Sequence, residues 1–459
     1  MISLIALLSG CAVGPKYVRP KAPIPKMYKE NADWKIAQPQ DEIIHGAWWK
    51  VFNDPQLDAL EDEVNISNQN IVQAQAQYAQ AYALVQAAKS ALFPTLGVGA
   101  SYTRSHGASD TQKGKSAVSD TLLTANVSWE VDLWGKIRRT MEANKANAQA
   151  SQADLENVRL SAQAQLAQDY FQLCSLDAQK KILDDTVAIY QKFLDLTKNR
   201  YASGVAAQSD VIQAQTQLEG AEAQEIDLGV QRSQLEHAIA LLIGKPASDF
   251  SLGPLSLPAG VPSVPAGLPS EILERRPDVA AAERTVAAAN ALIGVAESAY
   301  FPTLTLSASG SYGDSDLSRI FSSPNPLWSI GPALAETIFD AGLRQAQTTQ
   351  ARAVYDADVA TYRQTVLTAF EQVEDNLAAL RILEQEAQVQ DAAVKDAQKA
   401  VGLETNQYKA GTVSALDVIT TQATALSDEK ADVTILGERL NACVLLIQYL
   451  GGGWNVSDQ

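Results

Sequence analysis

Apolar residues recur at every seventh position through a long polar stretch in the second half of the chain. The series is Val366, Val373, Leu380, Ala387, Val394, Val401 and Tyr408. A repeat of this period, sustained over so many turns, is typical of a helix that packs in a coiled coil. From Gly342 to Tyr408, roughly 65 residues at about 1.5 Å each would extend on the order of 100 Å. The pattern therefore predicts a rod, because no globular domain needs so long a helix.

The stretch that follows has its own apolar series, spaced alternately by three and four. Its members are Leu416, Ile419, Ala423, Leu426, Val433, Leu440, Val444 and Ile447, interrupted by Lys430 and Gly437. The first half of the chain offers a matching series, Ala214, Ala221, Leu228, Leu235 and Leu242. Each half thus predicts an antiparallel helix pair. A coiled-coil structural protein that is not a channel would show the same series.

Two hairpins precede these helix pairs. In "TLGVGASYT", Leu96, Val98, Ala100 and Tyr102 alternate with small polar residues, and "LLTANVSWEVDLW" returns, which predicts a hairpin at about 94–132. "SAYFPTLTLSASGSYG" from Ser298 repeats "SALFPTLGVGASY" from Ser90 and predicts a second hairpin at about 302–338. Four strands alone would leave open edges in lipid, so we expect the sheet to close with other copies.

The repetition sets the domain boundaries that we expect. Residues 1–10 form a signal segment, 11–53 an N-terminal surface segment, 54–260 the first repeat, 261–450 the second and 451–459 a tail. Within the first repeat, one helix is expected from Asp54 to Leu92, where the residue before a proline ends it. A segment rich in Pro and Gly links the repeats without packing as an element of its own.

Each helix pair turns at a similar tip, "RYASGVAAQSD" at about 201–210 and "QYKAGTVSALD" at about 408–417. Gly204 and Gly411 fall where the turn needs positive φ, which glycine adopts without penalty. Asp210 and Asp417 follow near the start of the returning helix, where a carboxylate meets unpaired backbone N–H groups. We expect Asp210 to act as this helix-start carboxylate. For Asp417 a second role is open, because tips that converge in an oligomer would form an acidic ring.

Charge and residue usage exclude several classes of protein. The formal net charge is −17, with no basic stripe, which argues against binding to nucleic acid. The three histidines lie far apart and "GKS" at Gly114 lacks the rest of a phosphate loop, so we predict no enzyme, no metal and no cofactor. No apolar run reaches the roughly 18 to 20 residues of a membrane-spanning helix. Strands must then make any membrane crossing.

Cys11 stands apart from Cys174 and Cys443, which fall within helical patterns. It follows "MISLIALLSG", and Leu-Ser-Gly-Cys resembles the bacterial lipobox, in which the cysteine receives a covalent lipid after signal cleavage. Ala12 resembles the residue of lipoproteins sorted to the outer membrane. The apolar run is short and has no basic residue, so we expect a truncated start, with an ordinary apolar N-terminus as the alternative.

Six features in order resemble the TolC-like outer-membrane efflux duct family, and within it the lipoprotein branch that serves resistance-nodulation-division pumps. They are the two tips, "CAVGPKYVRP", "WWKVFNDPQLDAL", the paired "FPTL" and "ERRPDVAAAE". The resemblance implies a mainly α fold with a transmembrane β-barrel. In it, a homotrimer forms a twelve-stranded barrel continuous with a twelve-helix periplasmic coiled-coil α-barrel, and each chain contains two tandem repeats.

The resemblance also implies a function and its site residues. The expected function is a passive, gated exit duct in the outer membrane of a Gram-negative bacterium, which carries small toxic molecules from a periplasmic adaptor and an inner-membrane pump. Tyr408 and Asp417 match two gate positions, whereas a second acidic position falls on Thr420. The adaptor would meet Gly204 and Val205 at one tip and Gly411 and Thr412 at the other. Protein export with an ABC-type pump is the alternative, and the cargo stays open.

Overall fold

The computed structural model describes residues 12–25, 27–31, 46–106, 117–262, 264, 275–314 and 326–452 of the chain. It divides into two compact units, Met1–Lys21 with Ala76–Gln152 and Ala281–Arg363, and Ala22–Gln75 with Ala153–Ala280 and Gln364–Gln459. Each unit draws on both halves of the sequence. The units therefore cut across the two repeats expected from the sequence, because helices from one repeat pack against helices from the other.

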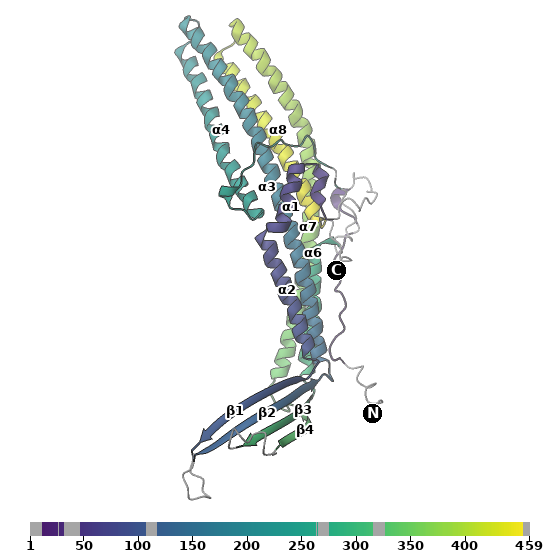
Figure 1. Cartoon of the computed structure of the whole chain (residues 1–459). Helices are drawn as coiled ribbons and strands as arrows, with labels where there is room; N and C mark the ends of the chain where they lie inside the picture. The colour runs from purple at the N-terminus through teal and green to yellow at the C-terminus, as the bar shows by residue number, and fades with distance from the viewer. Residues whose placement is uncertain are drawn as a thin grey trace. The chain divides into compact units, whose positions relative to one another are not determined.

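Unit 1 contains a four-stranded antiparallel sheet in the order β1-β2-β3-β4 (Figure 1). The strands are β1 (Thr95–Ser105), β2 (Val118–Val131), β3 (Thr303–Asp314) and β4 (Pro326–Ala335). Each half contributes one hairpin, and β2 pairs with β3 to join the two. The prediction of four strands is confirmed.

The register separates apolar from polar side chains. Leu96 pairs with Val127, which pairs with Ala308, which pairs with Ile330, and all four lie on one face. The same face holds Val98, Tyr102, Leu123, Trp129, Leu306, Trp328 and Leu334. The opposite face is rich in Ser, Thr, Gly and Asn. Val98, Trp328 and Ile330 are at least 75% exposed, so the described residues leave much of the apolar face uncovered.

Seven α-helices are found among the described residues. They are α1 (Pro55–Ser67), α2 (Gln69–Ser90), α3 (Lys136–Ala202), α4 (Gln208–Leu242), α6 (Pro277–Ser298), α7 (Leu343–Ala410) and α8 (Ala415–Tyr449). The predicted long helices are confirmed, at 67 residues for α3 and 68 for α7. Both contribute residues to unit 1 and to unit 2.

The prediction of a single helix from Asp54 to Leu92 is wrong, because the helix is interrupted at Asn68. Asn68 has extended backbone, and its side-chain oxygen accepts hydrogen bonds from the N–H groups of Asn70 and Ile71, at 2.9 and 3.2 Å. This is an N-cap, which begins α2 as a new helix. The side-chain amide of Asn68 donates to Leu242 at the end of α4, at 2.8 Å.

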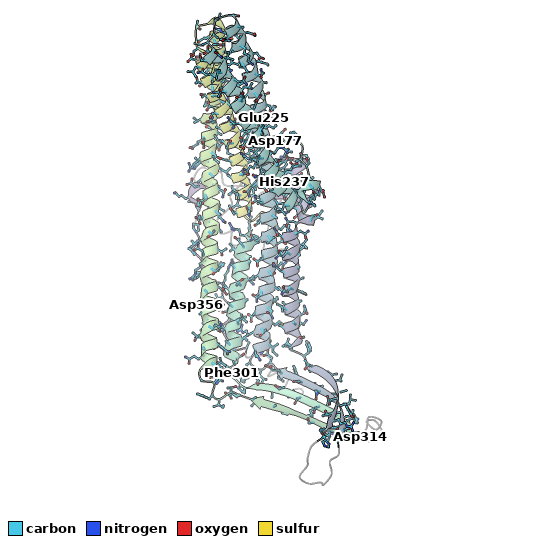
Figure 2. The ribbon with its side chains drawn as sticks, turned by 90° about the vertical axis from the view of Figure 1, so that its left-hand side faces the viewer. Asp177, Glu225, His237, Phe301, Asp314 and Asp356 are labelled. Atoms are coloured by element: carbon cyan, nitrogen blue, oxygen red, sulfur yellow. The ribbon has the colours of Figure 1, made fainter. Side chains whose placement is uncertain are left out.

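An aspartate caps each long helix where it leaves the sheet. Asp132 accepts from the N–H groups of Ile137 and Arg138 at 3.1 and 3.0 Å. Asp340 accepts from the N–H groups of Gly342 and Arg344 and pairs with the Arg344 guanidinium at 2.6 Å. These contacts, with Arg344 foremost, lower the pKa of Asp340. Phe301, labelled in Figure 2 at the root of the sheet, stacks on Trp134 with ring centroids 4.7 Å apart.

Residues 12–21 form an extended strap against the helices of unit 1. Arg139 donates to the carbonyl oxygens of Val13 and Gly14, both at 3.1 Å, and Asn290 donates to that of Pro15, also at 3.1 Å. Farther along, Arg363 donates to the carbonyl of residue 21 at 3.2 Å. A Cβ atom at Gly14 would collide with the backbone of Gly294 on α6. The helices thus hold the strap through its main chain and through two side chains: Tyr17 packs on Ala146, Ala287 and Ala288 and donates to Glu283, and Arg19 donates to the Tyr362 hydroxyl at 3.3 Å.

α6 is the helix that bears on the prediction that no apolar run is long enough to cross a membrane, although Glu283 and Arg284 interrupt its apolar sequence. Among the described helices it alone has the length and composition for such a span, and 67% of its most apolar window is buried in the protein. Its alanine-rich faces pack in unit 1, where Ala287 and Ala288 meet Ala146 of α3. The helix is a core element, and its apolar character serves close packing between helices.

In unit 2 the predicted apolar series lie inward in part. Leu380, Ala387, Val394 and Val401 of α7 are only half-buried. Val366, Val373, Leu440 and Val444 are fully buried. Leu416, which was expected to join them, is 51% exposed. It lies in the first turn of α8, where Ala415, Val418 and Ile419 take the inward positions instead.

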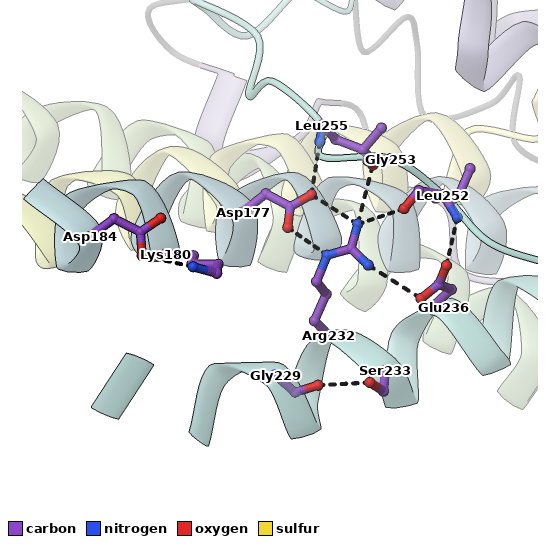
Figure 3. Close-up of polar contacts among 10 residues, drawn as sticks. All are labelled: Asp177, Lys180, Asp184, Gly229, Arg232, Ser233, Glu236, Leu252, Gly253 and Leu255. Atoms are coloured by element: carbon purple, nitrogen blue, oxygen red, sulfur yellow. Dashed lines mark hydrogen bonds and ion pairs between the residues drawn. The ribbon is translucent and has the colours of Figure 1, made fainter. Parts of the chain in front are cut away.

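Part of the segment between the repeats is held by a polar network, contrary to the expectation of an unpacked linker (Figure 3). Arg232 of α4 binds Asp177 of α3 at 2.7 Å and donates to the carbonyl oxygens of Leu252 and Gly253, at 2.9 and 3.2 Å. Asp177 also accepts from the N–H of Leu255 at 2.8 Å. The Arg232 guanidinium therefore joins two helices to the connecting segment.

Candidate functional site

Both helix-hairpin tips belong to unit 2, and both end their first helix in the same way. Gly204 and Gly411 have φ of +74° and +79°. At the first tip, the N–H groups of Val205 and Gly204 donate to the carbonyl oxygens of Arg200 and Tyr201, both at 2.9 Å. At the second tip the Thr412 and Gly411 N–H groups make the equivalent bonds to residues 407 and 408, both at 3.0 Å. Each tip is thus a Schellman motif closed by a glycine.

The returning helices begin differently. Asp417 accepts from the Ser414 N–H at 2.9 Å, while the Asp417 N–H donates to the Ser414 hydroxyl at 3.3 Å, which completes a capping box. The Ser414 hydroxyl also donates to Asp417, at 2.7 Å. Asp210 accepts from the Ala207 N–H at 3.2 Å, but alanine has no side chain to return a bond. The hydrogen bonds from Ser414 lower the pKa of Asp417, so this exposed carboxylate is ionised at neutral pH.

Tyr408 is buried beneath the tips, at 3% exposure, among residues of four helices. Its ring lies 5.2 Å from that of Phe193, and its hydroxyl lies 3.4 Å from that of Thr197, both on α3. The surrounding cluster includes Leu194, Ala214, Leu218, Ala415, Val418 and Ile419. Tyr408 therefore ties the end of α7 to the first helix pair.

Arg200 is the member of this site that sequence reasoning missed. Its guanidinium donates to the Tyr408 carbonyl at 2.7 Å and lies 4.4 Å above the centroid of the Tyr408 ring. A cation at the carboxyl end of α7 also opposes the negative end of the helix dipole. The two tips differ here, since Gln407 takes the position of Arg200 in the second tip. This difference between two otherwise similar tips was the sequence signal that could have identified Arg200 as a site residue.

The other predicted site residues lie at the surface of the tips. Val205 is 66% exposed, and Gly204, Gly411 and Thr412 are exposed too. Thr420 is exposed, and its hydroxyl donates to carbonyl oxygens of its own helix, at 3.0 Å to Leu416 and 2.9 Å to Asp417. The structure thus brings Tyr408 together with the first tip, and the predicted docking residues are exposed in the part of the chain that it describes.

Cys11, the predicted lipidation site, lies outside the described residues, and its acylation stays a prediction. The other two cysteines are buried and form no disulfide. Burial raises the pKa of Cys174 and of Cys443 to about 12. Within the described ranges, no group of three or more His, Cys, Asp or Glu residues is placed to hold a metal ion.

A sheet with one apolar and one polar face, joined to very long helix pairs with paired tips, defines a class of protein, the outer-membrane channels with a periplasmic helical part. Comparison with known proteins gives the family. The model of the outer membrane efflux protein family matches residues 60–245 and 268–452. The chain belongs to the outer membrane efflux protein family.

Individual relatives agree with this assignment over nearly the whole chain. The probable efflux pump outer membrane protein TtgC of Pseudomonas putida is 30% identical, covering 98% of this chain and 94% of its own. The pyoverdine export outer membrane protein OpmQ of Pseudomonas aeruginosa is 31% identical, covering 100% and 97%. Among solved structures, the outer-membrane channel OprN matches with a TM-score of 0.89 and 30% identity, over 97% of this chain and 100% of that one.

These findings confirm the predicted family, fold class and location. The protein is an efflux channel component of the outer membrane. Its family is one of transport ducts.

Proposed function

We propose that three copies of this chain close into one exit duct, which a periplasmic adaptor couples to an inner-membrane pump of the resistance-nodulation-division type. The duct passes small toxic molecules to the exterior and supplies no energy itself. Its periplasmic end is closed at rest by the second tip.

The observation that carries this proposal is the four-stranded sheet with unpaired outer edges. β1 and β4 are the outer strands, and each has a partner on one side only within the described sheet. In lipid, every unpaired backbone group costs several kcal/mol, roughly, so such a sheet must be closed. Pairing β1 of one copy with β4 of the next would remove both edges. The two strands can pair along almost their whole length, because they contain 11 and 10 residues.

The polar face favours three copies over two. Eight strands, from two copies, enclose a space that side chains must fill. The polar face offers mostly Gly, Ser and Thr, as in Gly97, Gly99, Ser307 and Ser309, and such residues are too small for that task. Twelve strands leave an open passage, with the apolar face toward lipid.

The tips support coupling to an adaptor. Gly204 with Val205, and Gly411 with Thr412, form two short exposed turns whose backbone is fixed by the Schellman bonds. A partner that binds the separated tips better than the joined ones would open the duct by that difference in affinity and no more. The contacts of Tyr408 with Arg200 and Phe193 are the ones such a partner must outweigh.

Photo-crosslinking in living cells tests this proposal. A photoreactive residue at Val205 or Thr412 should capture an adaptor of a drug-efflux pump, identified by mass spectrometry. The matched control is Ile226, which is 75% exposed on α4 and should capture no adaptor. Capture of an adaptor from an ABC-type secretion system would move the assignment to protein export. Extraction in detergent and native mass spectrometry should give a trimer, and a monomer would contradict closure.

A further inference from the structure

The polar face of the sheet has almost no charge. On β2 this face runs through Asp120, Leu122, Thr124, Asn126, Ser128 and Glu130. The two carboxylates lie at its ends, and Glu130 is paired with Lys136 at 3.1 Å. Every position between them on this face, on all four strands, is uncharged. Arg104 and Asp314 belong to the apolar face near the strand ends, where Figure 2 labels Asp314.

The middle of the face is mainly hydroxyl and amide groups and glycines in cross-strand rows, with Leu122 and Leu327 as its large apolar side chains. Gly97, Asn126, Ser309 and Ser329 form one such row, in which the Ser309 and Ser329 hydroxyls lie 2.8 Å apart. In the next row the Thr124 hydroxyl donates to the Gly99 carbonyl at 3.3 Å. A hydroxyl both donates and accepts hydrogen bonds, so it can replace hydration water around an anionic or a cationic group.

Distance removes the influence of the carboxylates at the two ends. At about 3.4 Å per strand residue, Asn126 lies roughly 20 Å from Asp120 and roughly 14 Å from Glu130 along the strand. Both distances exceed the Debye length of about 8 Å at physiological salt, so fixed charge at either end is largely screened at this row.

We propose that this face lines the exit passage as a charge-free wall of hydroxyl and amide groups, which passes cargo of either sign. The cargo class is then set by size and hydrogen bonding in the strand-built part, and charge discrimination falls to the helical part, where Asp417 lies. The inference rests on the proposed function, since the face lines a passage only in the closed oligomer.

Thiol accessibility tests the wall directly in the membrane-inserted protein. Ser309→Cys is treated with two small methanethiosulfonates, one with a quaternary ammonium group and one with a sulfonate, at physiological salt. Each rate is divided by the rate of the same reagent with a free small thiol. The two normalised rates should agree within about threefold, because screening leaves no net potential at this row. The parent chain gives the background, which should be low because Cys174 and Cys443 are buried.

The matched control is Ala308→Cys, one residue away on the apolar face, which should not react with either water-soluble reagent. A second variant, Ser309→Cys with Asn126→Asp, places a carboxylate directly opposite the thiol and should favour the cationic reagent. No change in that variant would overturn the proposal, because the thiol would not then share the passage with its neighbour.

The two possible failures are distinguishable. If Ser309→Cys reacts about tenfold faster with the cation while Ala308→Cys stays silent, the wall is acidic and only this inference fails. If Ala308→Cys reacts and Ser309→Cys does not, the faces are inverted and the proposed duct fails as well.

Discussion

A single arginine distinguishes the two helix-hairpin tips, and it acts across the pair. Arg200 combines a hydrogen bond to a helix-end carbonyl with a position over the Tyr408 ring. Neither contact can be seen in the sequence, because the two residues lie 208 positions apart. Lysine would keep the charge but lose the planar guanidinium that makes both contacts at once.

Arg200→Lys should therefore loosen the second tip. A hydrogen bond to a charged group is worth about 1.5 to 3 kcal/mol, so the amides of Gly411 and Thr412 should exchange with solvent about tenfold faster or more. Hydrogen exchange with mass spectrometry measures this. Lys409→Met removes an exposed cation from the same tip and should leave exchange unchanged. Equal exchange in Arg200→Lys and the parent would show that the arginine does not hold the tips together.

Glu61 places a carboxyl group in the core of unit 2. It is fully buried on α1, and neither of its carboxylate oxygens has a hydrogen-bond partner in the described structure. Burial first, then the negative charges of Asp62 and Asp58, raise the pKa of Glu61 well above its usual range. The folded chain thus holds this proton more tightly than the unfolded chain does.

The stability that this proton binding provides is complete below the ordinary pKa of 4.5 and is lost as pH rises through the folded value. Glu61→Gln stays neutral at every pH. Its advantage in unfolding free energy over the parent should grow by up to about 1.4 kcal/mol per pH unit in that window. Urea unfolding followed by circular dichroism across the acidic and neutral range measures it. Glu222→Gln, at an exposed position on α4, should show no such growth.

At the scale of elements, the two returning helices differ in a single capping hydroxyl. The N-cap of α8 is Ser414, which forms a complete capping box with Asp417. The N-cap of α4 is Ala207, whose backbone N–H donates to Asp210 but which has no hydroxyl to accept the return bond. The two halves of the chain therefore provide reciprocal variants at equivalent positions.

Ser414→Ala should fray the first turn of α8, and Ala207→Ser should protect the first turn of α4. An N-cap hydroxyl typically contributes about 1 kcal/mol to helix stability, which would alter local exchange about fivefold. Because Ser414 holds the pKa of Asp417 low, Ser414→Ala should also return that pKa toward its ordinary value. Exchange at residues 415–418 and 208–211 reports on the caps. A change of the same sign in both variants would contradict the capping argument.

Periodicity made the elements predictable, whereas the contacts between them were not. The seven-residue series predicted α7 correctly, because a helix that buries one face repeats apolar residues such as Val366 and Val373 at that spacing. The same reasoning failed at Leu416, where the turn into α8 shifts which residues face inward, and at Asn68, where a cap breaks an apolar pattern that continues across it. At the tips, glycine and aspartate spacing revealed both turns. The partnership of Arg200 with Tyr408 depends on helix packing, which no local pattern encodes.

At the scale of the whole molecule, assembly into the proposed trimer would let the exposed carboxylate of Asp417 act on ion passage. In the proposed trimer, Asp417 would appear three times around the closed end, with a lowered pKa that keeps each copy charged. Asp210 holds the equivalent place on the first tip and serves as the matched control.

Asp417→Ala should raise single-channel conductance in planar bilayers about twofold or more, because it removes the capping box that holds the first turn of α8 at the closed end. It should also weaken cation preference, because the ring of carboxylates is lost. Asp210→Ala should change neither quantity. Identical currents and ion selectivity in Asp417→Ala and the parent would remove this residue from the gate.

The strap at residues 12–21 bears on how this protein tolerates sequence change. Arg139, Asn290 and Arg363 bind its carbonyl oxygens, which every amino acid possesses. Substitutions at exposed strap positions such as Lys16 and Val18 therefore leave these backbone contacts in place. Tyr17 is different, because it packs on Ala146, Ala287 and Ala288 and donates to Glu283. Gly14 is restricted as well, since any side chain there meets the backbone of Gly294. Over evolutionary time, the exposed positions of the strap can therefore change in composition while its backbone contacts, Tyr17 and Gly14 keep it on the helices.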